Sequence, residues 1–204
     1  MRIIAGKYRG RNLKSPPSLD VRPTSDRLRE TLFNVIAPRI AGTSFLDLCA
    51  GSGAVGIEAL SRGAAHVTFV DQSRKMFTLI ETNLELCRIP TEEVKVIQAE
   101  ASDFLRTAVR LAEKPSSIRK GEPWDIVFFD PPWADDYSPV LKMFEAHSAS
   151  LLSEEGLLIV EHHHKQELPE NLGSLRRYRV LKQGDSALSF YTGESERAGV
   201  NPTS

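Results

Sequence analysis

The feature that most limits how this chain can fold is a regular alternation of short apolar runs with stretches of helical periodicity. The apolar runs fall at residues 44–49, 66–70, 94–97, 125–129 and 157–160, and the helical stretches at 53–62, 73–88, 102–113 and 138–151. Strands that are apolar throughout are typical of a parallel sheet with helices on both faces. With two later strands expected at 177–182 and 187–192, the pattern predicts a doubly wound α/β domain with a mostly parallel seven-stranded sheet.

The first 40 residues differ from the rest in their charge. They hold nine lysines and arginines against three acids, a net charge of +6, on a chain whose formal net charge is −1. We expect two short strands here, 2–5 and 11–14, joined by a glycine-containing turn, and then a helix capped by Thr24 or Ser25. So basic a segment predicts a surface that contacts phosphate groups, although an ordinary solvated face is the alternative.

Size and composition indicate one globular domain. The chain has 204 residues, of which 41% are hydrophobic and 26% charged. We divide it into a basic N-terminal hairpin and helix (1–40), a main domain (41–193) and a flexible tail (194–204), with a surface loop at 114–123. The apolar runs are too short to cross a membrane, and the two cysteines do not indicate a disulfide framework. We expect a cytoplasmic protein, with no membrane partner, and a monomer.

A glycine-rich turn follows the first apolar run. Residues 47–56 read Asp-Leu-Cys-Ala-Gly-Ser-Gly-Ala-Val-Gly, and this pattern between a strand and a helix lets the backbone approach a nucleotide closely. Asp71 lies 20 residues after Gly51, at the end of the next strand, where a carboxylate can bind ribose hydroxyls. The alternative is that Asp47 caps the turn and that the glycines only pack the helix against the strand.

The acid before the turn bears on which nucleotide binds. A carboxylate at Asp47 would repel the pyrophosphate of a dinucleotide, but it suits a ligand that carries an ammonium and a sulfonium group. That description fits S-adenosylmethionine. Cys49 has no basic partner nearby in the sequence, so it is better explained as a small buried residue than as a nucleophile.

A second motif, Asp130-Pro131-Pro132-Trp133, follows the strand at 125–129. It is therefore expected at the same carboxyl edge of the sheet as the glycine turn, where ligands bind in such folds. The prolines have no backbone N–H, so the carboxylate of Asp130 and the carbonyls of Asp130 and Pro131 offer acceptors only. Such a pocket matches the exocyclic amine of a base, and Trp133 adds a flat face for stacking. A rigid turn with an aromatic lid is the alternative.

The acceptors also have a chemical use. The lone pair of an exocyclic amine is delocalised into the ring, and two acceptors on its hydrogens favour a geometry in which the lone pair points at the sulfonium methyl group. Positioning then supplies much of the rate acceleration, and Asp130 can accept the proton that the methylated nitrogen releases.

These motifs resemble the amino-group methyltransferases that use S-adenosylmethionine. The N-terminal runs at 1–11 and 22–30, with 46–54 and 184–188, are similar to the RsmD-type methyltransferases of bacterial small-subunit ribosomal RNA, and the similarity extends to about Gly193. The resemblance implies a Rossmann-like class I methyltransferase fold. It also implies methyl transfer to the N2 amine of a guanine in 16S ribosomal RNA, within the small ribosomal subunit or an assembly intermediate.

The resemblance assigns residues to three groups. S-adenosyl-L-methionine would be bound by Asp47, Cys49, Gly51, Gly53, Asp71, Gln72, Glu100 and Ala101. The target guanine would be held, and methyl transfer assisted, by Asp130, Pro131, Pro132 and Trp133. The RNA would be contacted by Arg22, Thr24 and Arg27.

Three other functions stay open at this point. Adenine-N6 methylation of DNA uses a motif of the same kind, although only about forty basic residues remain here to read a sequence. A nucleotide-dependent dehydrogenase would share the glycine turn, and a non-catalytic ribosome assembly factor would share the basic segment.

Other polar residues carry no functional prediction. His162, His163 and His164 should point alternately to opposite faces of a strand end, so at most two of them could meet one ion, and only Glu161 lies near in sequence to complete a site. We predict no metal site. The pair at 135–136 reads as a solvated approach to the next helix.

Overall fold

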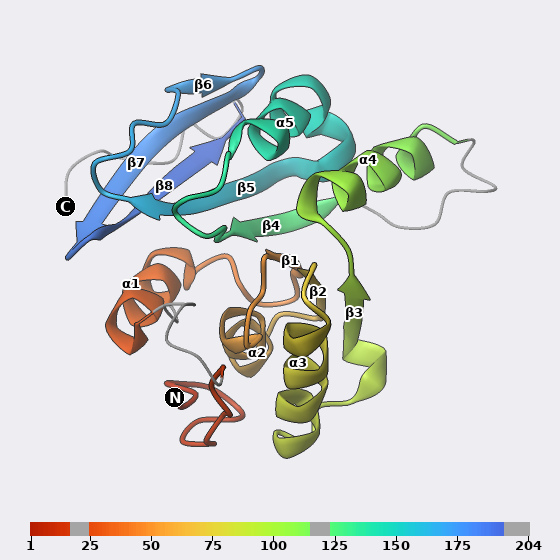
Figure 1. The fold of residues 1–204 in the computed structure, drawn as a ribbon, viewed down its shortest axis with the longest axis vertical. Coiled ribbons are helices and arrows are strands. Elements are labelled where there is room, and N and C mark those ends of the chain that lie inside the picture. Colours follow the sequence, from red (N-terminus) through yellow and green to blue (C-terminus); the bar gives the residue numbers. More distant parts are fainter. Residues whose placement is uncertain (17–24, 115–122, 194–204) are drawn as a thin grey trace.

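In a computed structural model, which describes residues 1–16, 25–114 and 123–193, one eight-stranded sheet runs through the molecule (Figure 1). The strand order is β3-β2-β1-β4-β5-β8-β7-β6. The parallel strands are β1 (Ser44–Leu48), β2 (His66–Asp71), β3 (Val94–Gln98), β4 (Trp124–Phe129) and β5 (Leu152–His163). The antiparallel strands are β6 (Asn171–Leu172), β7 (Leu175–Gln183) and β8 (Ser186–Thr192).

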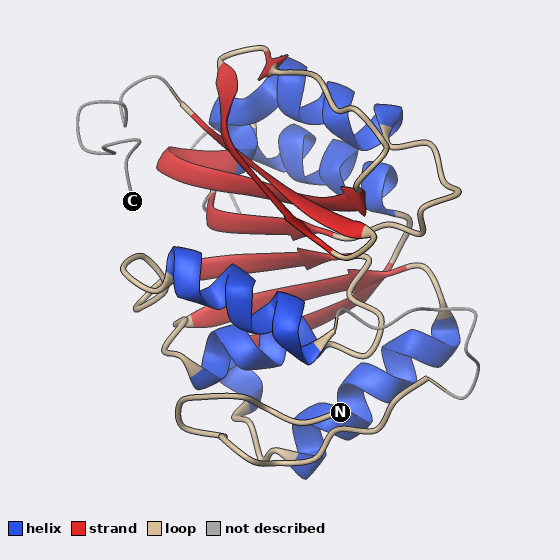
Figure 2. Ribbon diagram, turned by 90° about the vertical axis from the view of Figure 1, so that its left-hand side faces the viewer, coloured by secondary structure: helices blue, strands red, loops and turns tan. Residues whose placement is uncertain are grey.

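Helices cover both faces of this sheet (Figure 2). One face carries α1 (Asp26–Ile36), α2 (Ala54–Ser61) and α3 (Arg74–Leu86), and the other carries α4 (Ala101–Ala112) and α5 (Ser138–Leu151), while a short 3-10 turn, η1 (Thr91–Glu93), precedes β3. Each layer of helices packs against one face of the sheet, and a separate cluster of buried apolar residues lies between them on each face. The doubly wound, mostly parallel architecture is therefore confirmed.

The helices begin where the sequence places their caps. The hydroxyl of Ser25 accepts a hydrogen bond from the Leu28 amide at 3.1 Å, so Ser25 is the N-cap of α1. Thr24, the other candidate, lies outside the described residues. The apolar stripe of α3 faces the core, with Met76, Ile80 and Leu84 buried.

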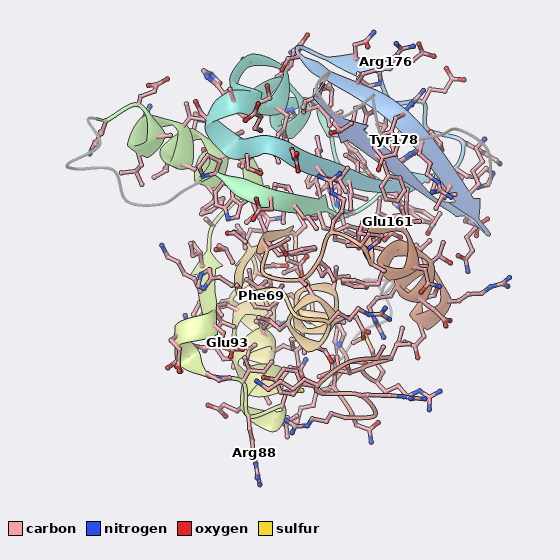
Figure 3. The ribbon with its side chains drawn as sticks, turned by 180° about the vertical axis from the view of Figure 1, so that it is seen from behind. Phe69, Arg88, Glu93, Glu161, Arg176 and Tyr178 are labelled. Atoms are coloured by element: carbon pink, nitrogen blue, oxygen red, sulfur yellow. The ribbon has the colours of Figure 1, made fainter. Side chains whose placement is uncertain are left out.

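The strand prediction needs three corrections. The sheet has eight strands and not seven, because β6 has only two residues and leaves no periodicity to detect. β5 begins at Leu152, five residues before the apolar run at 157–160, since Trp124 pairs with Leu152 across an irregular register. β7 extends the predicted 177–182 by two residues at its start and one at its end. Its Arg176 and Tyr178 project outward, whereas Phe69 of β2 lies inside the molecule (Figure 3).

The N-terminal segment 1–16 does not form the two strands that we expected. Only a single bridge joins Arg2 and Asn12. The amides of Ile4 and Ala5 donate instead to the carboxylate of Glu58 on α2, at 2.8 and 3.0 Å. Backbone hydrogen bonds from Ile3 to Arg11, from Leu13 to Met1 and from Gly10 to Ile3 still join the two arms, but the turn is too tight for a ladder of two strands.

The same segment is held at two further points against α2 and α3 (Figure 1). The Tyr8 amide donates to the hydroxyl of Ser61 at 2.9 Å. Buried Asn83 accepts from the Lys14 amide at 2.8 Å and donates to the Lys14 carbonyl at 3.1 Å. With Ile3, Tyr8 and Leu13 also buried, the segment belongs to the apolar core.

Part of the N-terminal positive charge is used inside the protein. Arg29 of α1 is fully buried, where its guanidinium donates to the Arg2 carbonyl at 2.7 Å and to Asp26 at 2.9 Å, and it lies 3.8 Å from Glu58. Arg11 donates to the carbonyl of Cys87. Counting charges along the sequence therefore overstates the basic surface that this region offers to a partner.

Two predicted segments fall largely outside the described residues: the loop at 114–123, of which 115–122 is not described, and the tail at 194–204. Among the helices of the described ranges, none is long and apolar enough to span a bilayer.

Candidate active site

The predicted motifs meet at one edge of the sheet. The carboxyl ends of the parallel strands carry the glycine turn after β1, Asp71 on β2, Glu100 after β3 and Asp130 after β4. The register pairs Leu48 of β1 with strand ends on both sides, Val70 on β2 and Phe129 on β4. This edge is where ligands bind in doubly wound folds.

The glycine turn bends sharply through left-handed backbone conformations. The φ angles are +62° at Cys49, +55° at Gly51 and +76° at Gly53, and Gly53 is the N-cap of α2. A Cβ atom at Gly53 would lie 3.3 Å from the side chain of Ile80. Position 53 therefore favours glycine for both its φ angle and its close contact with α3.

Asp47 lies behind this turn and is 1% exposed. Its Oδ2 accepts a hydrogen bond from the Gly56 amide at 2.8 Å, in the first turn of α2. Burial raises the pKa of Asp47 to about 8, although the Gly56 hydrogen bond opposes the shift. The carboxylate thus ties the strand to the helix, which is the capping role named as the alternative, and it does not line the cleft described below.

Asp71 holds the open side of the same turn. One carboxylate oxygen accepts from the Gly51 amide at 2.9 Å and the other from the Ser73 amide at 2.8 Å. Burial raises the pKa of Asp71 above its ordinary value, and these two hydrogen bonds oppose the rise. Each oxygen keeps a further lone pair, so the carboxylate can also accept from the hydroxyls of a ligand.

Glu100 caps the helix after β3. Its Oε2 accepts from the Ser102 hydroxyl at 2.6 Å and from the Asp103 amide at 2.9 Å. Its burial by itself would raise the pKa of Glu100, but the hydrogen bonds from Ser102 and Asp103 together lower the pKa below its ordinary value. Glu100 is therefore ionised at neutral pH and fixed in place beside Ala101.

A shallow cleft with a volume of about 60 Å³, open to solvent, runs between these elements. Six of the predicted residues line it: Cys49, Asp71, Gln72, Glu100, Ala101 and Pro131. Its other lining residues are Val70, Ala99, Phe129, Asp135, Asp136, Pro139 and Val140. Apolar walls with a few carboxylates are the lining typical of small-molecule sites.

The proline motif is anchored beside the glycine turn. The Asp130 amide donates to the carbonyl of Leu48 at 3.2 Å, one residue before the turn begins. The Asp135 amide donates to the Pro132 carbonyl at 2.9 Å, which folds the following residues back toward the cleft. The two motifs, about 80 positions apart in the sequence, thus lie next to each other.

Acidic side chains converge on Cys49. Burial, followed by the negative charges of Asp71, Asp130, Asp47 and Asp135, raises the pKa of the Cys49 thiol far above its ordinary value. The thiol therefore stays protonated and is no nucleophile, as expected. With Asp47 largely protonated at neutral pH, it is the carboxylates of Asp71 and Asp135 that would attract a cationic ligand and repel a pyrophosphate at this edge.

Trp133 lies at the outer end of the motif and is half-buried. Its indole ring meets the imidazole of His163 edge to face, with ring centroids 4.7 Å apart. The indole is not part of the apolar core, so a side of it remains accessible at this edge of the sheet.

The three histidines are arranged differently from the expected alternation. His162 is buried and contacts the Ser189 hydroxyl at 2.9 Å, whereas His163 and His164 stack with centroids 4.6 Å apart, because β5 ends at His163. Possible ligand atoms of His163, His164 and Asp185 lie within 4.8 Å of one another. The carboxylate nearest to completing a metal site is thus Asp185 and not Glu161; the absence of a metal site stays a prediction.

The three residues expected to contact RNA are only partly placed. Arg27 is exposed in the first turn of α1. Arg22 and Thr24 lie outside the described residues.

Sequence reasoning missed several residues of this site. The pair at 135–136, interpreted as a solvated approach to a helix, is exposed but lines the cleft together with Pro139 and Val140. Tyr137 is 3% exposed, and within the described residues its hydroxyl has no hydrogen-bond partner. Their position directly after the proline motif was the available signal.

Known proteins resemble this chain along nearly its whole length. Residues 1–192 match the family described as Conserved hypothetical protein 95. The Escherichia coli K12 protein named ribosomal RNA small subunit methyltransferase D is 35% identical over 197 residues, covering 96% of this chain and 91% of that protein. The Haemophilus influenzae protein of the same name is 40% identical over 134 residues, which cover 65% of this chain and 64% of that protein.

Solved structures agree with these matches. The Escherichia coli protein yhhF superposes with a TM-score of 0.78 at 34% identity, covering 96% of this chain and 99% of that one. A hypothetical protein from Thermus thermophilus gives a TM-score of 0.74 at 30% identity, covering 93% of this chain and 98% of that one. The chain therefore belongs to the family described as Conserved hypothetical protein 95, the RsmD family that its N-terminal and glycine-turn motifs resemble.

Proposed function

We propose that this protein transfers a methyl group from S-adenosylmethionine to the exocyclic N2 amine of a guanine in small-subunit ribosomal RNA. The observation that carries the proposal is the hydrogen bond from the Asp130 amide to Leu48, which sets the acceptor-rich motif directly beside the glycine turn. The names of the relatives that match most of the chain support an RNA substrate.

The residues of the cleft fit the proposed cofactor. Asp71 and Gln72 can bind the ribose hydroxyls, and the backbone around Glu100 and Ala101 can bind the adenine against the apolar wall that includes Phe129. Asp71 supplies negative charge at the open side of the turn, which favours the ammonium and sulfonium groups of S-adenosylmethionine. The bound cofactor supplies an electrophilic methyl group on its sulfonium sulfur.

The motif at 130–133 then orients the target base. Trp133 stacks on the guanine, while the Asp130 carboxylate and the Pro131 carbonyl accept the two hydrogens of the N2 amine. The new N–C bond forms as the S–C bond breaks, with the electron pair of that bond remaining on sulfur. Asp130 accepts the proton that the methylated nitrogen gives up.

The test is methyl transfer by Asp130→Asn, which keeps the size of the side chain and removes its charge and basicity. We expect kcat on undermethylated small ribosomal subunits to fall by roughly 10²–10⁴-fold, while the Kd of S-adenosylhomocysteine changes little. Labelled cofactor should mark one guanine when the wild-type protein is used. Wild-type transfer to no RNA at all, with cofactor bound, would overturn the proposal.

The choice of substrate is tested in the same assay. Assembled subunits should be better substrates than naked RNA fragments, since little of the chain remains outside the sheet and its helices to recognise a sequence. Efficient methylation of adenine in duplex DNA would favour the DNA alternative instead. Tight binding of NAD without binding of S-adenosylhomocysteine would indicate a dehydrogenase. If wild type and Asp130→Asn bind the ribosomal subunit equally well and neither transfers a methyl group, the protein would be an assembly factor.

A further inference from the structure

Tyr137, a residue outside the predicted motifs, contains a buried polar group that the structure leaves unused. It is the N-cap residue of α5, and its ring packs edge-on against Phe129 with centroids 5.7 Å apart. The residue is 3% exposed, and among the described residues its hydroxyl has no hydrogen-bond partner. A buried hydroxyl without a partner lowers the free energy of unfolding, so a function for the group would account for its presence.

Nearby carboxylates act electrostatically on this hydroxyl. Burial, and then the negative charges of Asp130, Glu161 and Asp135, raise the pKa of Tyr137 well above its ordinary value. The hydroxyl is therefore protonated at neutral pH, and it can serve as a donor to a carboxylate. Tyr137 thus stands ready to donate a hydrogen bond that is not made in the structure.

Asp130 is the acceptor that fits best. It directly follows Phe129, on which the Tyr137 ring packs, and of the three carboxylates it has the largest effect on the pKa of the hydroxyl. Glu161 lies within β5 (Figure 3), where it already accepts from the Ser186 hydroxyl at 3.0 Å. Asp135 is exposed on the turn after the proline motif.

We propose that Tyr137 is a positioning residue whose hydroxyl donates a hydrogen bond to the Asp130 carboxylate when the guanine amine binds. This bond fixes one carboxylate oxygen and leaves the other to accept from the amine and then to take its proton. The inference rests on the proposed function and assigns to it a residue that neither sequence motif includes.

The test is Tyr137→Phe, with Tyr8→Phe as the matched control. Tyr8 is 2% exposed and lies in the N-terminal segment 1–16; its hydroxyl likewise makes no hydrogen bond of good geometry within the described residues, although it is close enough to the Lys7 ammonium to raise the pKa of Lys7. Both substitutions keep the ring and remove one unpaired hydroxyl, so the melting temperature should stay the same or rise in both. Tyr137→Phe should lower kcat by about tenfold, with the KM for subunits and the Kd of S-adenosylhomocysteine within about twofold of wild type.

The pH dependence gives a second readout. A hydrogen bond to the ionised form of Asp130 lowers the pKa of that carboxyl group, so losing the bond moves the acid limb of kcat to higher pH. Tyr8→Phe should leave both kcat and the acid limb unchanged. A Tyr137→Phe enzyme with wild-type kcat and an unmoved acid limb would overturn this inference alone, whereas a wild-type protein without methyl transfer would overturn the proposed function itself.

Discussion

Two glycine-containing turns of this protein look alike in sequence and differ in what their backbones contact. The N-terminal turn contains Gly6 and Gly10, both with φ of +80°, and the turn after β1 contains Gly51 and Gly53. The first turns inward, since side chains of α2 and α3 accept amides of its segment. The second lies beside a cleft and is held by Asp71 at the Gly51 amide, by Asn83 at the Ser52 carbonyl and by Asp47 at the start of α2.

The difference teaches that glycine spacing alone does not distinguish a structural turn from a ligand-binding one. The acidic residues that bind each turn do distinguish them. Glu58, which accepts from the N-terminal turn, is fully buried on a helix. Asp71 instead ends a parallel strand and lines the cleft, where its two oxygens keep lone pairs for the hydroxyl groups of a ligand.

The largest expected effect comes from Gly6→Ala, which tests whether the inward turn is structural. A Cβ atom at this position would overlap the backbone carbonyl of Ser61, and φ is already unfavourable for alanine. The segment would detach and expose Ile3, Tyr8 and Leu13, at a cost of at least about 5 kcal/mol. Urea unfolding followed by circular dichroism measures the change.

Gly10→Ala is the matched control for this substitution. It has the same φ of +80°, but a Cβ atom added there would meet no atom within 4 Å among the described residues. The expected loss is therefore only the conformational cost, about 1 kcal/mol. Equal losses for the two variants would mean that the contact with Ser61 is not what holds the segment.

The next effect concerns the acid behind the ligand-binding turn. The pKa of Asp47 is about 8 in the folded protein and 3.8 for the ordinary side chain, so between these values the folded state binds more protons than the unfolded state. Stability should therefore fall as the pH rises from about 4 to 8. Asp47→Asn removes this titration and still accepts from Gly56, so it should stabilise the protein at pH 7 by at most about 4 kcal/mol.

The measurement is a series of urea unfolding curves for wild type and Asp47→Asn from about pH 4.5 to 9, a range that covers most of the expected titration and passes its upper end. The difference should widen with pH and be small at the acid end. If Asp47 also binds the cofactor's ammonium group, the stabilised variant should bind S-adenosylmethionine more weakly. A difference in stability that does not depend on pH would contradict the raised pKa.

Much of the fold could be predicted, because apolar periodicity reports directly on burial. The five parallel strands and the helices between them follow from it, and Ser25 follows from cap chemistry. The N-terminal segment could not be predicted in the same way. Its backbone amides are satisfied by Glu58, Ser61 and Asn83, which lie 53 to 69 positions away in the sequence and carry no local signal.

The site shows the same division. The glycine turn and the proline motif each follow a strand, so the sheet itself brings them to one edge. Pro139 and Val140 line the cleft only because the chain folds back after Pro132, and the unpaired hydroxyl of Tyr137 becomes apparent only once its surroundings are known. Contacts made by chain reversal are tertiary, and local patterns do not encode them.

Apart from the Gly10→Ala control, the smallest expected effect on stability belongs to Asn83, which connects the two turns. This buried amide holds the Lys14 backbone on one side and donates to the carbonyl of Ser52, between the two glycines of the ligand-binding turn, at 2.9 Å on the other. Asn83→Ala leaves those backbone groups without their partner, and we expect a loss of about 2 kcal/mol in the free energy of unfolding.

The more informative readout is the coupling between the turns. If Asn83 joins them mechanically, adding S-adenosylhomocysteine to the wild-type protein should slow hydrogen exchange at the Lys14 amide, and Asn83→Ala should abolish that slowing while weakening cofactor binding by only about threefold. By reciprocity, Gly10→Ala, which loosens segment 1–16, should also slightly weaken the binding of the cofactor. If S-adenosylhomocysteine does not change the rate of hydrogen exchange at the Lys14 amide of the wild-type protein, the N-terminal turn and the turn after β1 share Asn83 but act independently.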